Sequence, residues 1–163
     1  MASIIGGSDE RCPGLAPRAA LYIMRVFTSD QISFTSWFLD AMNYAMASGI
    51  HVLNLSIGGP DFLDVPFAEK IREAAASGIT IVSACGNDGP VWGTQNSPAD
   101  ELAVIGVGGY DHIIDGIAPF SSRGMTTWSL PMGVGRPKPD VITMSVNLHG
   151  ATADGYGLSL IHI

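Results

Sequence analysis

The stretch Ile79–Pro90, ITIVSACGNDGP, decides the fold. It is an apolar run rich in β-branched residues that stops at Gly-Asn-Asp-Gly-Pro, and apolar runs bounded by Gly and Pro are typical of buried strands. Asn87 therefore follows a strand on a glycine-rich turn. A fixed side-chain N–H donor suits a site where negative charge develops on an oxygen. The alternative is a plain tight turn, because Asn tolerates a left-handed backbone and Gly prefers one.

A second apolar run, Val52–Pro60, ends in the similar turn Ser56-Ile57-Gly58-Gly59-Pro60. Between the two runs, residues 66–77 have the spacing of an amphipathic helix that begins near Pro66 and ends at Gly78. A strand, a helix and a strand within about thirty residues predict a βαβ unit, whose two strands are parallel. The glycosylation pattern at Asn54 falls inside this predicted buried strand, where a bulky surface modification does not fit.

Three further segments extend the pattern: a strand over Ala20–Phe27, a helix over Ile32–Ser48 and a strand over Leu102–Gly108. Alternating strands and helices predict an α/β fold with a mostly parallel central sheet. In such a fold, ligands bind at the carboxyl ends of the strands. Both glycine-rich turns are expected at that edge.

Six short stretches, in this order, resemble the subtilisin-like serine protease family: Ser56-Ile57-Gly58, Ala84-Cys85-Gly86-Asn87, Asn96-Ser97-Pro98-Ala99, Ile105-Gly106-Val107-Gly108, Phe120-Ser121-Ser122-Arg123-Gly124 and Lys138-Pro139-Asp140-Val141. The resemblance covers residues 1–157 and implies a three-layer fold that is incomplete at both ends. Several stretches are more similar to a membrane-anchored convertase of the secretory pathway than to a bacterial subtilisin. This implies a polypeptide substrate, a lumenal location and cleavage after a non-basic residue, with Arg favoured a few positions upstream.

The resemblance also implies a role for each matching residue. Asn87 would donate its side-chain amide to the oxyanion of the tetrahedral intermediate. Ser56, Ile57 and Gly58 would pair with an extended substrate by strand addition. The pocket for the residue before the scissile bond would have a wall made by Ala84, Cys85 and Gly86 and a floor near Ala99. No cofactor or metal is expected in this segment, although the family implies calcium for full-length members.

The catalytic triad of this family is missing from the sequence. Its His belongs to a His-Gly-Thr motif and its Ser to a Gly-Thr-Ser motif, and neither motif is present. The opening MASIIGG resembles the helix that follows the His, and the resemblance stops at Gly157, before the Ser. None of His51, His112, His149 and His162 is followed by Gly-Thr, so we expect no rebuilt triad. The alternative function is therefore a catalytically inactive peptide-binding module with a subtilisin-like cleft.

The last six residues, Leu158–Ile163, read LSLIHI. This is the translation of the end of a transposase-type sequencing adapter (CTG TCT CTT ATA CAC ATC), and it begins where the family resemblance stops. We therefore expect residues 158–163 to be a non-native tail and exclude them from the fold.

The composition excludes other classes of function. The net charge of −7 argues against binding to nucleic acid. No apolar run is long enough to span a membrane, so we expect a membrane association only through an anchor elsewhere in a longer protein. A nucleotide-binding domain fails because no P-loop motif is present and Gly106–Gly109 lies in a strand. Cys12 and Cys85 have no metal-binding spacing, and Cys85 is expected to be buried and unreactive.

Overall fold

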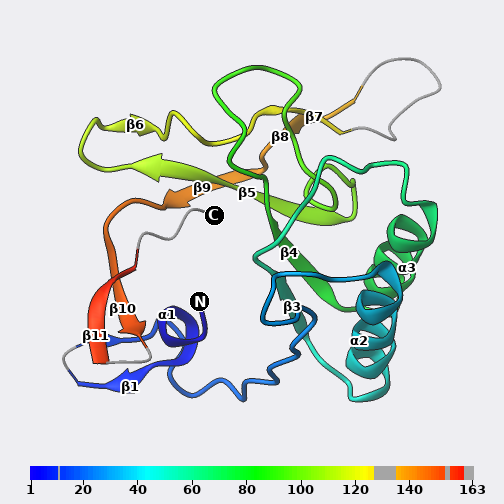
Figure 1. The fold of residues 1–163 in the computed structure, drawn as a ribbon, viewed down its shortest axis with the longest axis horizontal. Coiled ribbons are helices and arrows are strands. Elements are labelled where there is room, and N and C mark those ends of the chain that lie inside the picture. The colour runs from blue at the N-terminus through cyan, green and yellow to red at the C-terminus, as the bar shows by residue number, and fades with distance from the viewer. Residues whose placement is uncertain (11, 127–134, 153–154, 160–163) are drawn as a thin grey trace.

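The computed structural model describes residues 1–10, 12–126, 135–152 and 155–159 (Figure 1). The helices are α1 (Ala2–Gly6), α2 (Thr35–Ala47) and α3 (Val65–Ala76). The strands are β1 (Ser8–Asp9), β2 (Cys12–Pro13), β3 (Val52–Leu55), β4 (Thr80–Ala84), β5 (Val104–Asp111), β6 (Gly116–Ile117), β7 (Gly124–Met125), β8 (Pro137–Lys138), β9 (Val141–Met144), β10 (Leu148–Thr152) and β11 (Gly155–Ser159).

The main sheet confirms the predicted parallel arrangement. β3 pairs with β4, β4 pairs with β5, and β5 pairs with β9, all three in parallel, while β6 adds a short antiparallel strand to β5. The register places Leu55 beside Ser83, and Ser83 beside Gly106. The turns that follow β3 and β4 therefore leave the sheet at the same edge, as the βαβ pattern predicts.

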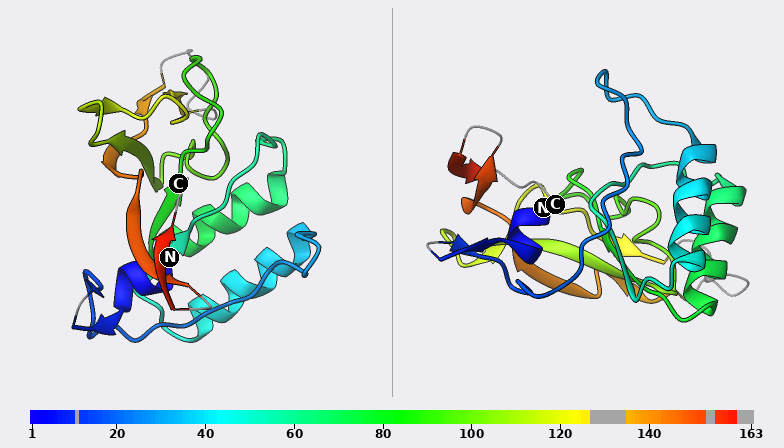
Figure 2. Two further views of the ribbon diagram at one scale, coloured as in Figure 1. Left: turned by 60° about the vertical axis from the view of Figure 1, so that its left-hand side comes forward. Right: turned by 90° about the horizontal axis from the view of Figure 1, so that it is seen from below.

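Helices α2 and α3 lie side by side on one face of the sheet (Figure 2). α3 begins where the sequence predicts, because the Asp64 side chain accepts a hydrogen bond from the Phe67 N–H and Pro66 occupies the first turn. The core between these helices and strands β3 to β5 consists of buried apolar side chains: Met42, Ala45, Ile71, Ala74, Ile79, Ile81 and Val104. Two of the three expected layers, the sheet and this helix layer, are thus present.

The opposite face of the sheet carries apolar side chains that the described residues leave exposed. Val52 and Ile105 are 58% and 39% exposed, and the register places both on the face away from α2 and α3. The remaining short helix, α1, lies against β2 and β10 instead. The described residues therefore cover this sheet with helices α2 and α3 on one face only.

Two predictions about strands are wrong. Residues 20–27 form no strand, because no described strand pairs with them, and Leu21, Tyr22 and Ile23 are exposed. Residues 52–55 do form a strand, but it is not buried, since β3 lies at the edge of the sheet and alternates between exposed and half-buried positions. Asn54 is accordingly exposed, and its amide donates to the Ser56 hydroxyl at 2.9 Å.

The expected tail falls partly inside the structure. Leu158 and Ser159 belong to β11, which pairs antiparallel with β10, whereas residues 160–163 lie outside the described residues. The hairpin places these two residues next to His149 and Leu148 along the backbone. Their non-native origin stays a prediction from the sequence.

A buried ion pair fastens the chain after β8 to the centre of the sheet. The Lys138 side chain is fully buried, and its ammonium donates to the Val104 carbonyl at 2.7 Å and to the Asp140 carboxylate at 2.6 Å. The same carboxylate accepts from the Gly106 N–H at 2.7 Å and pairs with Arg136 at 2.9 Å. Burial raises the pKa of Asp140, but these hydrogen bonds and positive charges outweigh burial and bring it below its usual value.

We expect Asp140 to make the stability depend on pH at the acid end. A carboxyl whose pKa is lowered by folding contributes stability above its unfolded pKa, and this contribution is lost as the pH falls through the folded pKa. The wild-type melting temperature should therefore fall below about pH 4. Asp140→Asn should be less stable than wild type at pH 7, and its melting temperature should change less with pH between pH 2 and 7. Asp40→Asn, which removes an exposed carboxyl on α2, is the control, and equal acid limbs in the two variants would contradict the prediction.

Candidate substrate cleft

The expected site residues lie at the edge where β3 and β4 end. Leu55 is opposite Ser83 in the register, so Ser56 and Ala84, the next residues along the two chains, leave the sheet together. The Ser83 hydroxyl, which is buried, donates across this edge to the carbonyl oxygens of Leu55 and Ile57 at 3.2 and 3.4 Å. These hydrogen bonds join the turn after β3 to β4, the strand that leads into the Asn87 turn.

Asn87 projects from the turn after β4. Gly86 has a φ of +106°, a conformation that favours glycine, and its carbonyl accepts from the Ser122 N–H at 3.1 Å. The Ser122 hydroxyl accepts from the Asp88 N–H at 3.0 Å, so the backbone is fixed on both sides of Asn87. Asn87 itself is exposed, and among the described residues its side chain makes no hydrogen bond. Its amide is free to donate to a ligand.

The predicted wall and floor residues are mostly covered. Ala84, Cys85 and Ala99 are 7%, 0% and 0% exposed. The Cys85 thiol points into the protein, where its sulfur contacts the Ser121 hydroxyl and the Ser122 carbonyl at 3.5 and 3.3 Å. Burial raises the pKa of this thiol, which agrees with the expectation that it is unreactive. The Cys85 N–H donates to the Val107 carbonyl at 2.9 Å, so neither the side chain nor the N–H of this buried residue faces the cleft.

The segment Asn96–Ala99, which the sequence analysis used only for its family motif and for Ala99, runs between the two turns. The backbone of Ser97 pairs antiparallel with Gly59, with N–H···O distances of 2.9 and 3.2 Å, and the Asn96 N–H donates to the Cys85 carbonyl at 3.0 Å. The Asn96 side chain thus comes to lie beside both turns. The stretch Asn96–Ala99 was recognised as a family motif, but only the folded chain shows that its first side chain borders the cleft.

Next to the first turn is an acidic pocket of about 240 Å³. Its walls are aromatic, since the Phe38 ring packs edge-on against Phe67 and Phe27 at 5.7 and 5.8 Å between centroids. Two of its lining residues carry carboxylates, and the others come from the start of α2 and the chain before it, the turn after β3, the start of α3 and the segment Ser97-Pro98. The full lining is Phe27, Ser33, Phe34, Thr35, Phe38, Ile57, Gly58, Gly59, Asp61, Asp64, Phe67, Ser97 and Pro98. Sequence reasoning missed this pocket, although Asp61 and Asp64 directly follow the glycine turn.

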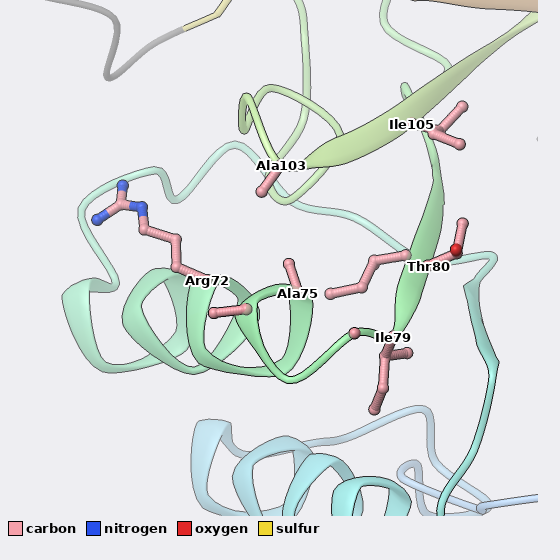
Figure 3. A pocket seen from close by; sticks show the side chains of 9 residues that line it. Arg72, Ala75, Ile79, Thr80, Ala103 and Ile105 are labelled. Atoms are coloured by element: carbon pink, nitrogen blue, oxygen red, sulfur yellow. The ribbon is translucent and has the colours of Figure 1, made fainter.

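A larger hollow of about 590 Å³ lies elsewhere, between the end of α3 and the beginnings of β4 and β5 (Figure 3). Its lining is mainly aliphatic, with Ala75, Ile79 and Ile105 among the side chains, and Arg72 at one side. These residues belong to the amino ends of the strands, opposite to the edge with the glycine-rich turns. The hollow is therefore separate from the candidate cleft.

The rest of the described chain supplies no further catalytic groups at the cleft. His51 precedes β3, at the other end of the sheet from Ser56, and in the described residues neither His51 nor His112 hydrogen-bonds a serine. The described residues also contain no group of three or more His, Cys, Asp or Glu arranged to hold a metal ion. No helix in the described part of the chain is long and apolar enough to cross a membrane.

Comparison with known proteins agrees with this geometry. Residues 1–158 match the model of the subtilase family, Peptidase_S8. The chain belongs to the subtilase family. It is 57% identical over 155 residues to the membrane-bound transcription factor site-1 protease of Homo sapiens and 57% identical over 151 residues to the subtilisin-like protease SBT6.1 of Arabidopsis thaliana. These matches cover 95% and 93% of the chain, but 14% of each relative, so the chain corresponds to a segment of such a protease.

The fold is shared with solved subtilase structures. The self-cleaved protease domain of PatA superposes with a TM-score of 0.78 at 25% identity, over 98% of this chain and 60% of that one. The α/β fold with a parallel central sheet is thus the subtilisin-like fold, of which the segment contains about half. The chain is therefore a segment that belongs to a family of subtilisin-like serine endopeptidases.

Proposed function

We propose that this segment forms the substrate cleft and oxyanion donor of a serine endopeptidase that cleaves lumenal segments of membrane proteins in the secretory pathway. The observation that carries the proposal is the shared sheet edge, where the free Asn87 amide and the Ser56–Gly58 turn follow neighbouring parallel strands. An extended peptide that pairs with Ser56, Ile57 and Gly58 would place a carbonyl oxygen within reach of that amide. The 57% identity to site-1 protease supports the choice of substrates and compartment.

The segment supplies two parts of the reaction. The peptide is bound through main-chain hydrogen bonds, and negative charge that develops on the carbonyl oxygen during attack is stabilised by the Asn87 N–H. The attacking serine, its histidine base and the orienting aspartate would come from parts of a complete protease domain that this sequence does not contain. The second candidate, an inactive peptide-binding module, describes how the 163-residue chain by itself should behave.

The proposal is tested by grafting residues 1–157 into human site-1 protease in place of the homologous segment. The graft should cleave a fluorogenic peptide that has Arg upstream and Leu before the scissile bond, and replacing the host's catalytic Ser by Ala should abolish cleavage. The 163-residue chain should bind the same peptide without cleaving it. A folded graft that fails to cleave, while the host enzyme cleaves, would contradict the assignment.

The acidic pocket supports a preference for a basic side chain upstream of the cleavage site. Gly58 belongs both to the pocket lining and to the turn expected to pair with the peptide, so a side chain of a bound peptide can enter the pocket. The carboxylates of Asp61 and Asp64 would pair with its charge, and the faces of Phe38 and Phe67 would contact a guanidinium. Each carboxylate oxygen that already accepts one hydrogen bond has capacity for another.

We expect the double variant Asp61→Asn, Asp64→Asn to lose this preference. Asn keeps the helix cap at position 64 and the turn at position 61 while it removes both charges. Affinity for an Arg-containing peptide should fall about tenfold, because a hydrogen bond to a charged group contributes about 1.5 kcal/mol. Affinity for the same peptide with Leu in place of Arg should not change, as fluorescence anisotropy would measure. Asp40→Asn, which removes an exposed charge from α2, should affect neither peptide.

A further inference from the structure

The hairpin that joins β5 to β6 carries a group of exposed apolar side chains. Ile113 and Ile114, in the turn of the hairpin, are 65% and 57% exposed. Ile117 on β6 and Met144 on β9 are also exposed, and the register places both directly opposite Tyr110 of β5. Side chains that stand directly opposite one another in a sheet share one face, so this row adjoins the turn. We call Ile113, Ile114, Ile117 and Met144 the hairpin patch.

The formation of the turn does not explain these side chains. The turn residues, 112–115, read His-Ile-Ile-Asp, whereas the residues that favour turns are Gly, Pro, Asn, Asp and Ser. Single exposed apolar side chains are common on protein surfaces, but a contiguous group of them indicates an interaction site. Two adjacent isoleucines at the tip of a hairpin therefore point to a ligand.

Two side-chain hydrogen bonds hold the hairpin in shape. The Asp111 carboxylate accepts from the Ile113 N–H at 2.8 Å, and the Tyr110 hydroxyl donates to the Asp115 carboxylate. The strands on either side of the turn are paired antiparallel, with Tyr110 opposite Ile117. A ligand would find the patch already formed, so binding would cost little conformational entropy in the hairpin.

The charge around the hairpin patch is negative. Asp111 and Asp115 flank the two isoleucines, and residues 107–122 contain no Lys or Arg. Neither carboxylate forms an ion pair with a cationic side chain of the described residues. A second copy of the chain would bring the same carboxylates together, and an anionic membrane surface would repel them. The ligand that fits is a polypeptide with apolar and basic side chains.

The order of the strands places the hairpin next to the cleft. Because the sheet order is β3-β4-β5, the Ser56–Gly58 turn, the Asn87 turn and the hairpin follow one another across the sheet. Ala84, the last residue of β4, stands beside Val107, and β5 continues past this point to Asp111. At about 3.4 Å per residue, the turn of the hairpin therefore stands on the order of 15 Å beyond the edge where β4 ends.

A peptide bound in the cleft would continue toward this hairpin. In the proposed function, the part upstream of the scissile bond pairs with the Ser56–Gly58 turn, and the reacting carbonyl lies at Asn87. The downstream part would then leave the cleft on the side of β5 and reach the hairpin within about five to eight extended residues. The chain after β6 also supports the Asn87 turn, since the Phe120 carbonyl accepts from the Gly89 N–H at 2.8 Å.

We propose that the hairpin patch is an exosite that binds a substrate segment downstream of the scissile bond, one that combines apolar and basic side chains. This inference rests on the proposed function, because it takes the course of the bound peptide from the cleft. Apolar side chains of the segment would cover Ile113 and Ile114, and its Lys or Arg side chains would pair with Asp111 and Asp115. The contact is the same in the ground state and in the transition state, so it should lower KM and leave kcat unchanged.

The test compares three substrates of the graft of residues 1–157 in human site-1 protease. All three contain the fluorogenic sequence with Arg upstream and Leu before the scissile bond. The short substrate ends soon after that bond, whereas the other two continue for about ten more residues, with either Lys and Val or Glu and Val in alternation. The KM of the Lys-Val substrate should be about tenfold lower than that of the short substrate, and the Glu-Val substrate should show no such gain.

Variants of the hairpin assign the gain to the patch. Ile113→Ser with Ile114→Ser should abolish the gain, and Asp111→Asn with Asp115→Asn should reduce it, because Asn keeps both hydrogen-bond acceptors without their charge. Leu15→Ser is the matched control, since Leu15 is 91% exposed and lies outside the hairpin. It should leave the KM of every substrate unchanged. Cleavage of the short substrate shows in each case that the enzyme is folded.

The outcomes separate this inference from the proposed function. If the graft cleaves the short substrate but gains nothing from the Lys-Val extension, or gains as much from Glu-Val, the inference is overturned and the proposed function stands. A gain that survives replacement of both isoleucines also overturns the inference. If a folded graft cleaves no substrate while the host enzyme does, both are overturned. Where the graft does not fold, labelled Lys-Val and Glu-Val peptides are compared on the 163-residue chain, and equal affinities overturn the inference.

The 163-residue chain also tests the other occupants of the patch. Its dimerisation is measured by light scattering, and its binding to phosphatidylcholine vesicles is measured by sedimentation. Either property, if it disappears when Ile113 and Ile114 are replaced by Ser, would assign the patch to a second copy or to a membrane and would overturn the inference. We expect the chain and the variant to behave alike in both measurements.

Discussion

Replacing Lys138 by Met is expected to lower the free energy of unfolding by about 3–5 kcal/mol, because it removes one partner of a buried ion pair. The Lys138 side chain is fully buried and bridges the Val104 carbonyl and the Asp140 carboxylate. Its removal leaves that carboxylate short of a counter-charge inside the protein and a carbonyl without its donor. Since domains of this size have only about 5–15 kcal/mol of stability, the variant should be largely unfolded near its wild-type melting temperature.

The matched control is Lys70→Met. Lys70 forms an i,i+3 pair with Glu73 on α3, and this Glu73 side chain is 58% exposed, so loss of the pair should cost less than about 1 kcal/mol. The double variant Lys138→Met, Asp140→Leu should recover part of the stability, because apolar residues of similar size often replace a buried pair at little cost. Urea denaturation measures all three. A Lys138→Met variant that loses no more stability than Lys70→Met would contradict the buried-pair account.

The parallel core of the fold could be predicted from sequence because an amphipathic helical pattern lies between two apolar runs, which is the pattern of a βαβ unit. Residues 66–77 repeat apolar side chains at helical spacing, and the runs on either side end in glycine-rich turns. The strand predicted over residues 20–27 failed for a different reason. Hydrophobicity and β-branching describe a strand's side chains, but a strand also needs a neighbouring backbone to pair with, and the described residues provide none there. The sequence predicted β3 as a buried strand for the same reason, because its apolar side chains do not show that only one neighbouring strand pairs with it.

The candidate cleft was predicted in part. The meeting of the Ser56–Gly58 and Asn87 turns follows from chain topology alone, since the carboxyl ends of parallel strands share one edge. Asn96 and Asp64 were not predicted as site residues, because their positions depend on where loops return to the sheet. The one local signal for Asp64 was its place just before Pro66, which marks the start of a helix. The depth of the cleft is therefore a property of tertiary contacts rather than of a motif.

Asn87→Ala is expected to lower kcat about 10²–10³-fold when residues 1–157 are grafted into human site-1 protease, the loss measured on removal of one oxyanion donor in subtilisin, a member of the same family. The Asn87 side chain makes no hydrogen bond among the described residues and is exposed, so truncation should leave stability within about 0.5 kcal/mol of wild type. Binding in the ground state depends on main-chain pairing with Ser56–Gly58, so KM should change little while kcat falls.

This separation of kcat from KM distinguishes an oxyanion donor from a turn residue. If Asn87 only shaped its turn, Asn87→Gly would preserve activity, because glycine adopts any conformation that asparagine does. An oxyanion donor predicts the opposite: Asn87→Gly and Asn87→Ala should lose kcat equally, since both lack the N–H. Asn87→Gln should retain more activity than either if its longer amide still reaches the carbonyl oxygen. If the Asn87→Gly variant kept the wild-type kcat, Asn87 would be a turn residue only, which is the alternative that its sequence also allows.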